Sequence, residues 1–95
     1  MALVVKDTVI PEDQVKNIVL KALKSRIEKI NSKIEEIKNN INYFKLKYGM
    51  ESEEFYRKFE TGELGDEMDF FEWKSSIEIL NDLKTERSAL IEAIG

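Results

Sequence analysis

Nine apolar side chains recur at alternating intervals of three and four residues along the first half of the chain. They are Leu20, Leu23, Ile27, Ile30, Ile34, Ile37, Ile41, Phe44 and Tyr48. This heptad spacing places all nine on one side of an α-helix, as in a coiled-coil seam. Pro11 suits the first turn of a helix and Gly49 suits the position just past its end. We therefore predict one long helix over residues 11–48.

The second half of the sequence predicts two more helices. Ser52 is a candidate N-cap for a short helix that ends near Gly62. The run Asp69-Phe70-Phe71-Glu72 resembles a capping box that begins a third helix ending near Ile94. The expected fold is all-α, a long antiparallel coiled-coil-like hairpin with a short connecting helix, assembling into a helical bundle. Residues 11–95 form this hairpin domain, and the apolar, β-branched residues 1–10 form an N-terminal tail or a short strand.

The composition excludes several classes of function. The 95 residues include no Cys and no His, which removes thiolate nucleophiles, zinc–thiolate sites and the commonest general base. The acids of residues 60–72 lack the spacing of a calcium-binding loop. We expect no enzyme activity, no metal and no cofactor. Because neither an apolar run of about 18 residues nor a signal peptide is evident, we expect a cytoplasmic protein without a membrane partner.

The predicted helices differ in length. At about 1.5 Å per residue, the first helix outreaches the third by about 18 Å. The extra segment is apolar around much of its circumference, through Val15, Ile18, Val19, Leu20 and Leu23. An apolar surface wider than one seam requires a second contact. We predict that a second chain covers it, either a copy of this one or another protein; the alternative is that residues 1–10 fold back over it.

Charge is segregated along the chain. Residues 15–48 carry nine Lys or Arg and three Glu, whereas residues 49–72 carry nine acids and two bases. Because the positions that flank the first-helix seam hold no acid, a parallel homodimer along this seam is disfavoured and an antiparallel partner with acidic edges is favoured. The basic stripe also raises nucleic-acid binding as an alternative. The net charge of −4 argues against that alternative. Its candidate contacts are Lys24, Arg26, Lys33, Lys38, Lys45 and Lys47.

Aromatic and acidic side chains gather around the predicted bend between the long helices. We expect Phe44, Phe55, Phe59 and Trp73 to form a core that fixes the bend. Because one short helix cannot bury every aromatic side chain there, some are candidates for partner contact. They are Tyr48, Tyr56, Phe70 and Phe71, with Asp66 and Glu67 on an acidic rim. The structural interpretation of these acids is that they begin the third helix.

One segment also resembles a recurring sequence pattern. In residues 47–80 the short motifs YGM, EF, GELGD and DFFEWK occur in this order. The residues that carry the pattern are Tyr48, Gly49, Phe55, Gly62, Leu64, Gly65, Asp66, Phe70, Phe71, Trp73 and Lys74. This pattern is similar to that of small helical proteins of archaea and bacteria. Some of them are encoded beside putative toxins and treated as candidate antitoxins. The resemblance implies a role in binding a partner protein such as a toxin.

Together these observations predict a protein–protein interaction module, with an antitoxin-like regulator as its most specific form. The predicted partner-binding residues are Val15, Ile18, Val19, Tyr48, Tyr56, Asp66, Glu67, Phe70 and Phe71. The predicted assembly is a homodimer or a complex with a different protein. The alternatives are a structural homodimeric bundle without a regulatory task and the nucleic-acid binder described above.

Overall fold

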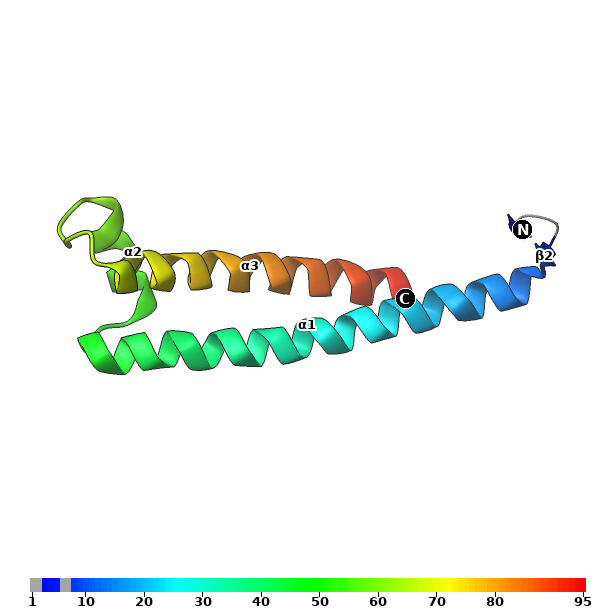
Figure 1. Ribbon diagram of the computed structural model, residues 1–95, viewed down its shortest axis with the longest axis horizontal. Helices are drawn as coiled ribbons and strands as arrows, with labels where there is room; N and C mark the ends of the chain where they lie inside the picture. The colour runs from blue at the N-terminus through cyan, green and yellow to red at the C-terminus, as the bar shows by residue number, and fades with distance from the viewer. Residues whose placement is uncertain (1–2, 6–7) are drawn as a thin grey trace.

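A computed structural model describes residues 3–5 and 8–95 of the chain. Three helices follow a small strand pair: α1 Glu12–Tyr48, α2 Ser52–Glu60 and α3 Met68–Ile94. The strands are β1 Leu3–Val5 and β2 Thr8–Ile10. The molecule is a rod of 61 × 20 × 19 Å in which α3 lies antiparallel along α1, with α2 at the bend (Figure 1). The all-α hairpin with a short connecting helix is thus confirmed.

The heptad seam forms the contact between the two long helices. Ile30, Ile34, Ile37, Ile41 and Phe44 are all buried, and each faces α3 because the three–four spacing keeps them on one side of α1. Toward the N-terminal end of the seam, burial becomes incomplete. Leu20, Leu23 and Ile27 are only half-buried. Burial of the seam therefore decreases toward the C-terminal end of α3.

The core is concentrated at the bend, which we define as the end of the rod that contains α2. Trp73 and Phe55 are fully buried there, with parallel rings whose centroids lie 3.9 Å apart. Phe44 also stacks on Trp73, with 5.8 Å between ring centroids, and half-buried Phe59 packs against Phe55. The expectation that these four aromatic residues form the core of the bend is confirmed. Stacked aromatic rings add about 0.5–1.5 kcal/mol per pair beyond the area that they bury.

The helix ends agree with the sequence in part. Gly49 adopts a left-handed conformation with φ of 62° directly after α1, as its position predicted. The predicted caps Ser52 and Asp69 are wrong: each lies inside the first turn of its helix, and neither caps it. Their side chains have other partners. Ser52 Oγ accepts a hydrogen bond from Trp73 Nε1 at 3.3 Å, and the Asp69 carboxylate accepts hydrogen bonds from α1.

Polar contacts on both flanks of the seam fix the register of the hairpin. Arg26 donates two hydrogen bonds to the Glu86 carboxylate, at 2.8 and 3.0 Å. Asn40 Nδ2 donates to Ser76 Oγ at 3.0 Å, and Arg87 donates to Asn31 Oδ1 at 2.9 Å. The antiparallel partner with acidic edges is confirmed by the pair between Arg26 and Glu86. Arg87, which interrupts the α3 pattern, places its charged group at the edge as its long stem allows.

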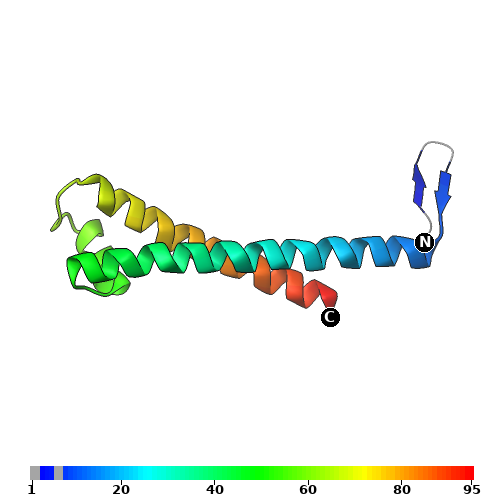
Figure 2. The ribbon, with the colours of Figure 1, turned by 60° about the horizontal axis from the view of Figure 1, so that its bottom comes forward.

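The N-terminal segment forms a strand pair instead of covering α1. Strands β1 and β2 are antiparallel, with Val4 opposite Val9. They stand to one side of the helix axis at the far end of the rod (Figure 2). Ile18 and Val19 are still 57% and 51% exposed, so the segment does not fold back over them. The expected tail or short strand is therefore two short strands, with residues 1–2 and 6–7 outside the described part.

Candidate partner-binding surfaces

The first candidate surface lies at the end of the rod where α3 stops, which we call the free end. Helix α1 has 37 residues and α3 has 27, so about 15 Å of α1 extends past its neighbour. We call this segment, residues 12–21, the overhang. A groove runs along it, between the overhang and the last turn of α3. Its lining residues are Val15, Lys16, Val19, Leu20, Leu23, Ala93 and Ile94.

Large apolar side chains at the free end are exposed, and of these Val19 and Ile94 line the groove. Ile18 and Val19 project from α1, and Ile91 and Ile94 project from α3 with 54% and 37% of their area exposed. Val15 is half-buried. The structure therefore brings all three predicted contacts of the overhang, Val15, Ile18 and Val19, to one end of the rod.

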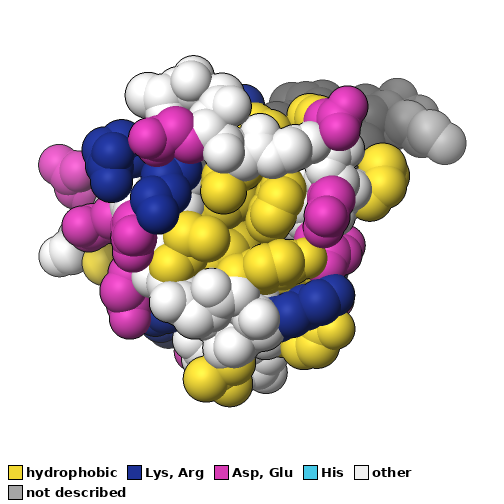
Figure 3. Space-filling model, turned by 90° about the vertical axis from the view of Figure 1, so that its left-hand side faces the viewer, with side chains coloured by type: hydrophobic (Ala, Val, Ile, Leu, Met, Phe, Trp, Pro, Cys, Tyr) yellow, Lys and Arg dark blue, Asp and Glu magenta, His cyan; other side chains and the backbone are white. Residues whose placement is uncertain are grey.

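The second candidate surface is the outer face of the bend. Hydrophobic side chains gather at the centre of this face, with acidic and basic side chains around them (Figure 3). Phe71 is 49% exposed and packs edge-on against Phe59 at 5.3 Å between centroids. Met68, beside it on the first turn of α3, is 80% exposed. Asp66 and Glu67 are exposed on the loop that leads into this turn.

Two other predicted contacts at the bend are structural. Phe70 was predicted to contact a partner, but it is only 7% exposed and packs in the core against Tyr48 and Phe55. It is not available to a partner, because it lies three residues before the buried Trp73 and therefore on the same inner face of α3, whereas Phe71 faces outward. Tyr48 is half-buried, and its hydroxyl donates a 2.6 Å hydrogen bond to Asp69.

Asp69 is the centre of a polar network that ties the end of α1 to the start of α3. Its Oδ2 accepts hydrogen bonds from Lys47 Nζ and Tyr48 Oη, both at 2.6 Å. The hydrogen bond from Lys47, and then that from Tyr48, lower the pKa of Asp69. The same carboxylate raises the pKa of Tyr48 and of Lys47, since it stabilises their protonated forms. The network fixes the end of α1 to the start of α3.

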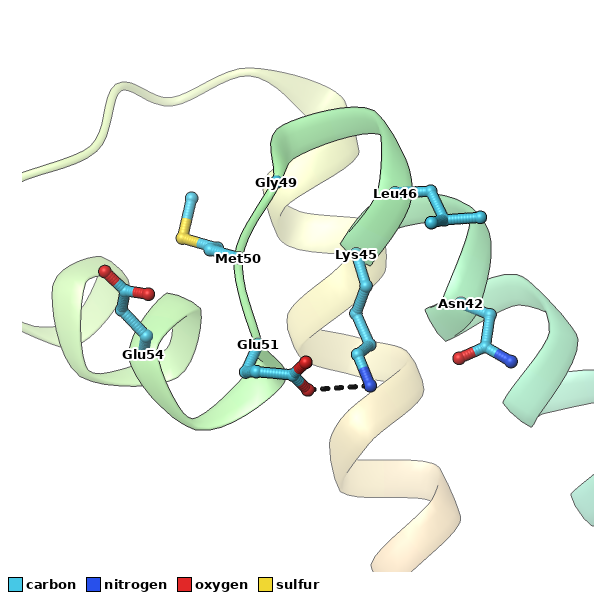
Figure 4. A pocket seen from close by; sticks show the side chains of 7 residues that line it. All are labelled: Asn42, Lys45, Leu46, Gly49, Met50, Glu51 and Glu54. Atoms are coloured by element: carbon cyan, nitrogen blue, oxygen red, sulfur yellow. Dashed lines mark ion pairs between the residues drawn. The ribbon is translucent and has the colours of Figure 1, made fainter.

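Tyr56 and the remaining hollows lie on the sides of the hairpin. Tyr56 is half-buried in a groove between α2 and α3, which also contains Arg57, Ile77 and Asn81. Another hollow lies where α1 turns into α2 (Figure 4). The ion pair between Lys45 and Glu51, at 2.7 Å, crosses its edge. Both hollows are open to solvent and mix apolar and charged walls.

The basic face of α1 is largely compensated within the chain. Arg26 pairs with Glu86, and Lys33 lies 3.5 Å from Glu36. Lys45 and Lys47 pair with Glu51 and Asp69. Four of the six predicted nucleic-acid contacts thus have carboxylate partners in the hairpin, which lowers the positive potential that a phosphate backbone requires.

Several exposed apolar residues were not among the predicted contacts. At the free end these are Ile91, Ala93 and Ile94 of α3, and at the bend they are Leu46, 85% exposed, and Met68. The α3 residues could have been found by aligning the ends of the two predicted helices, which places the last turn of α3 beside Leu23. Leu46 could have been found because it lies off the heptad seam.

The fold thus defines a class of protein, a two-helix hairpin with an aromatic bend and an uncovered end. None of the protein-family models, curated proteins or solved structures compared with this chain matches it. Among the described residues, no three acidic side chains cluster as a metal ion would require. Likewise, none of the described helices has the length and apolar content needed to cross a bilayer.

Proposed function

We infer that this chain is a protein–protein interaction module, and that its free end is the principal contact surface. One observation carries the inference: α1 outreaches α3 and leaves Val19 and the groove that it lines uncovered. Burial of apolar surface contributes roughly 25 cal/mol per Å², so a partner that covers this end gains free energy from side chains already held in place. Preformed helices also reduce the entropy lost on binding.

An antitoxin-like regulator is the more specific form of this proposal. At the bend, exposed Phe71 and Met68 stand beside the acidic Asp66 and Glu67, and the sequence pattern GELGD…DFFEWK resembles that of candidate antitoxins. An acidic, aromatic-bearing face suits a basic cleft on a partner such as a ribonuclease toxin. This form predicts that co-expression of the chain rescues growth from a toxin encoded beside it.

The inference is tested by placing a photo-crosslinking amino acid at position 19, which lines the groove, and irradiating living cells. Covalent adducts with another polypeptide chain, whatever its identity, are the expected result. A matched control at Glu28, exposed on the part of α1 that packs against α3, should give few adducts. If position 19 forms no more adducts than position 28, the free end is not a contact surface.

A further inference from the structure

The free-end groove has dimensions that fit one particular occupant. The hydrogen bonds between Asn40 and Ser76, Arg26 and Glu86, and Arg87 and Asn31 set the register of α3 along α1. Continued to the end of α3, this register places Ile94 level with residues 21–22 of α1. A helix of ten residues is therefore needed to continue the track of α3 along the overhang.

The overhang itself is a ten-residue helical segment that is already folded. We propose that the groove is filled by the overhang of a second copy of this chain, antiparallel to the first, which gives a symmetric dimer joined end to end. The proposal rests on the interaction function above and names the partner. In this dimer the second copy's α1 runs in the direction of α3 and takes the place beside the seam that α3 leaves empty.

The antiparallel overlap brings opposite charges of the two copies together. With residues 12–21 of the two copies overlapped, the two copies of Val15, which lines the groove, lie within about one helical turn of each other along the axis. Glu12 and Asp13 stand at one end of the overhang, whereas Lys21 and Lys24 stand at or just beyond the other. An antiparallel overlap brings each acidic end toward a basic end, and a parallel one would bring acids toward acids. Charge therefore selects the orientation.

One charge pair is well placed to test the orientation. Asp13 and Lys24 are eleven residues apart, close to three full helical turns, so they lie on the same flank of α1. Antiparallel helices bring the same flanks opposite each other, with Asp13 of one copy within about one turn of Lys24 of the other. The two copies of Lys16 come close to each other near the symmetry axis, where their charges repel. The Glu12 carboxylate of the same helix, 4.0 Å from Lys16 Nζ, offsets that repulsion.

The overlap is short, so the expected dimer is reversible and depends on concentration. Sedimentation velocity should show the chain passing from monomer to dimer as its concentration rises. Small-angle scattering should then show a maximum dimension on the order of 100 Å, because two rods of about 55 Å helix length overlap by about 15 Å. A side-by-side dimer would remain close to the 61 Å of one chain and would overturn the proposal.

Cysteine substitution tests the orientation directly, because the chain has no Cys of its own. In the antiparallel dimer Lys16 lies beside the axis, so Lys16→Cys should form a disulfide-linked dimer under mild oxidation. Leu20→Cys should not, because its two copies are about 10 Å apart along the helix, beyond the reach of a disulfide. Efficient crosslinking by both variants would indicate a parallel dimer and overturn the proposal.

Charge exchange provides the second test. Lys24→Asp should raise the dimer dissociation constant about tenfold, and addition of Asp13→Lys should restore it. Lys29→Asp is the matched control, because Lys29 is an exposed residue on the part of α1 that already packs against α3. Failure of the second substitution to restore dimerisation would overturn the assigned pairing.

The interaction function and the dimer can fail separately. If the purified chain stays monomeric at every concentration while position 19 crosslinks to a different protein in cells, the dimer is wrong and the interaction function stands. If position 19 gives no adducts beyond the control, both are wrong. Adducts with twice the mass of the chain support both.

Discussion

The two ends of this rod are built from the same helices but differ in how completely those helices are covered. At the bend, α2 closes over the hairpin, and Trp73 and Phe55 have no exposed area. At the free end, α1 continues without a neighbour, and Val19 in the groove is 51% exposed. The difference follows from helix length, because 27 residues of α3 cannot cover 37 residues of α1.

This difference separates stability from binding. The bend holds the stacked aromatic rings and the two side chains without exposed area, Phe55 and Trp73, so it should be the last part of the hairpin to open. The free end contributes little buried surface to the single chain, so a partner can cover it without displacing existing contacts. Regions of low local stability are those from which interaction surfaces are commonly drawn.

The largest expected effect comes from the middle of the seam, on which both ends depend. Ile34 is only 1% exposed, and Ile34→Asp places a carboxylate between α1 and α3 with no positive partner. Burial of an unpaired charge costs several kcal/mol, which exceeds what a small hairpin can lose. We expect no cooperative thermal unfolding by circular dichroism. An unchanged melt would contradict the assignment of the seam.

A matched pair of truncations compares the ends directly. Trp73→Ala removes the ring that contacts Phe44, Tyr48 and Phe55 and should cost about 3–5 kcal/mol in the free energy of unfolding. Leu23→Ala at the free end, where the side chain is half-buried, should cost about 1–2 kcal/mol when the chain is monomeric. Urea unfolding at low protein concentration measures both. Equal losses would contradict the idea that the bend carries the stability.

The sequence predicted the hairpin because its signals are local and mutually consistent. Heptad spacing from Leu20 to Tyr48, with Gly49 after it, is enough to define α1, and the bend follows from the glycines that separate the helices. The overhang was also predictable, since it requires only the lengths of two helices. These features depend on periodicity and on chain length, which a single sequence records.

What the sequence did not predict depends on helix phase and on contacts distant in sequence. Asp69 resembled a cap because an acid before a helix commonly is one, but Lys47 and Tyr48 of α1 provide stronger partners. Phe70 lies three residues before Trp73 on the inner face of α3, so Phe70 faces the core and Phe71 faces solvent. The Ser52 hydroxyl likewise accepts a hydrogen bond from Trp73 Nε1 instead of capping α2.

The Asp69 network predicts a pH dependence confined to the bend. The pKa of Asp69 lies below its ordinary value of 3.8, so its contribution to stability is present above pH 3.8 and is lost as the pH falls toward its folded pKa. The pKa of Tyr48 lies above 10.0, so its contribution is full below pH 10.0 and is lost as the pH rises through its folded pKa. The stability difference between wild type and Asp69→Asn, followed by urea unfolding, should therefore be largest at neutral pH and shrink at both extremes. A difference independent of pH would show that the network does not stabilise the fold.

The smallest effect on stability is expected for Phe71→Ala, and that small effect makes it the sharpest probe of the outer face of the bend. Phe71 contacts Phe59 at its ring edge but leaves half of its area in solvent, so the substitution should change the free energy of unfolding by no more than about 1 kcal/mol. Its neighbour provides the contrast, because Phe70→Ala removes a core ring and should cost about 3–5 kcal/mol.

If the bend binds a partner protein, Phe71→Ala should weaken that complex at least tenfold while the melt and the free-end dimer stay unchanged, because an exposed aromatic anchor contributes about 2 kcal/mol or more to binding. Isothermal titration of the complex measures this loss. An undiminished affinity would assign binding to the free end alone. The bend would then serve only to hold α1 and α3 together, and the contrast between a stabilising end and a binding end would be complete.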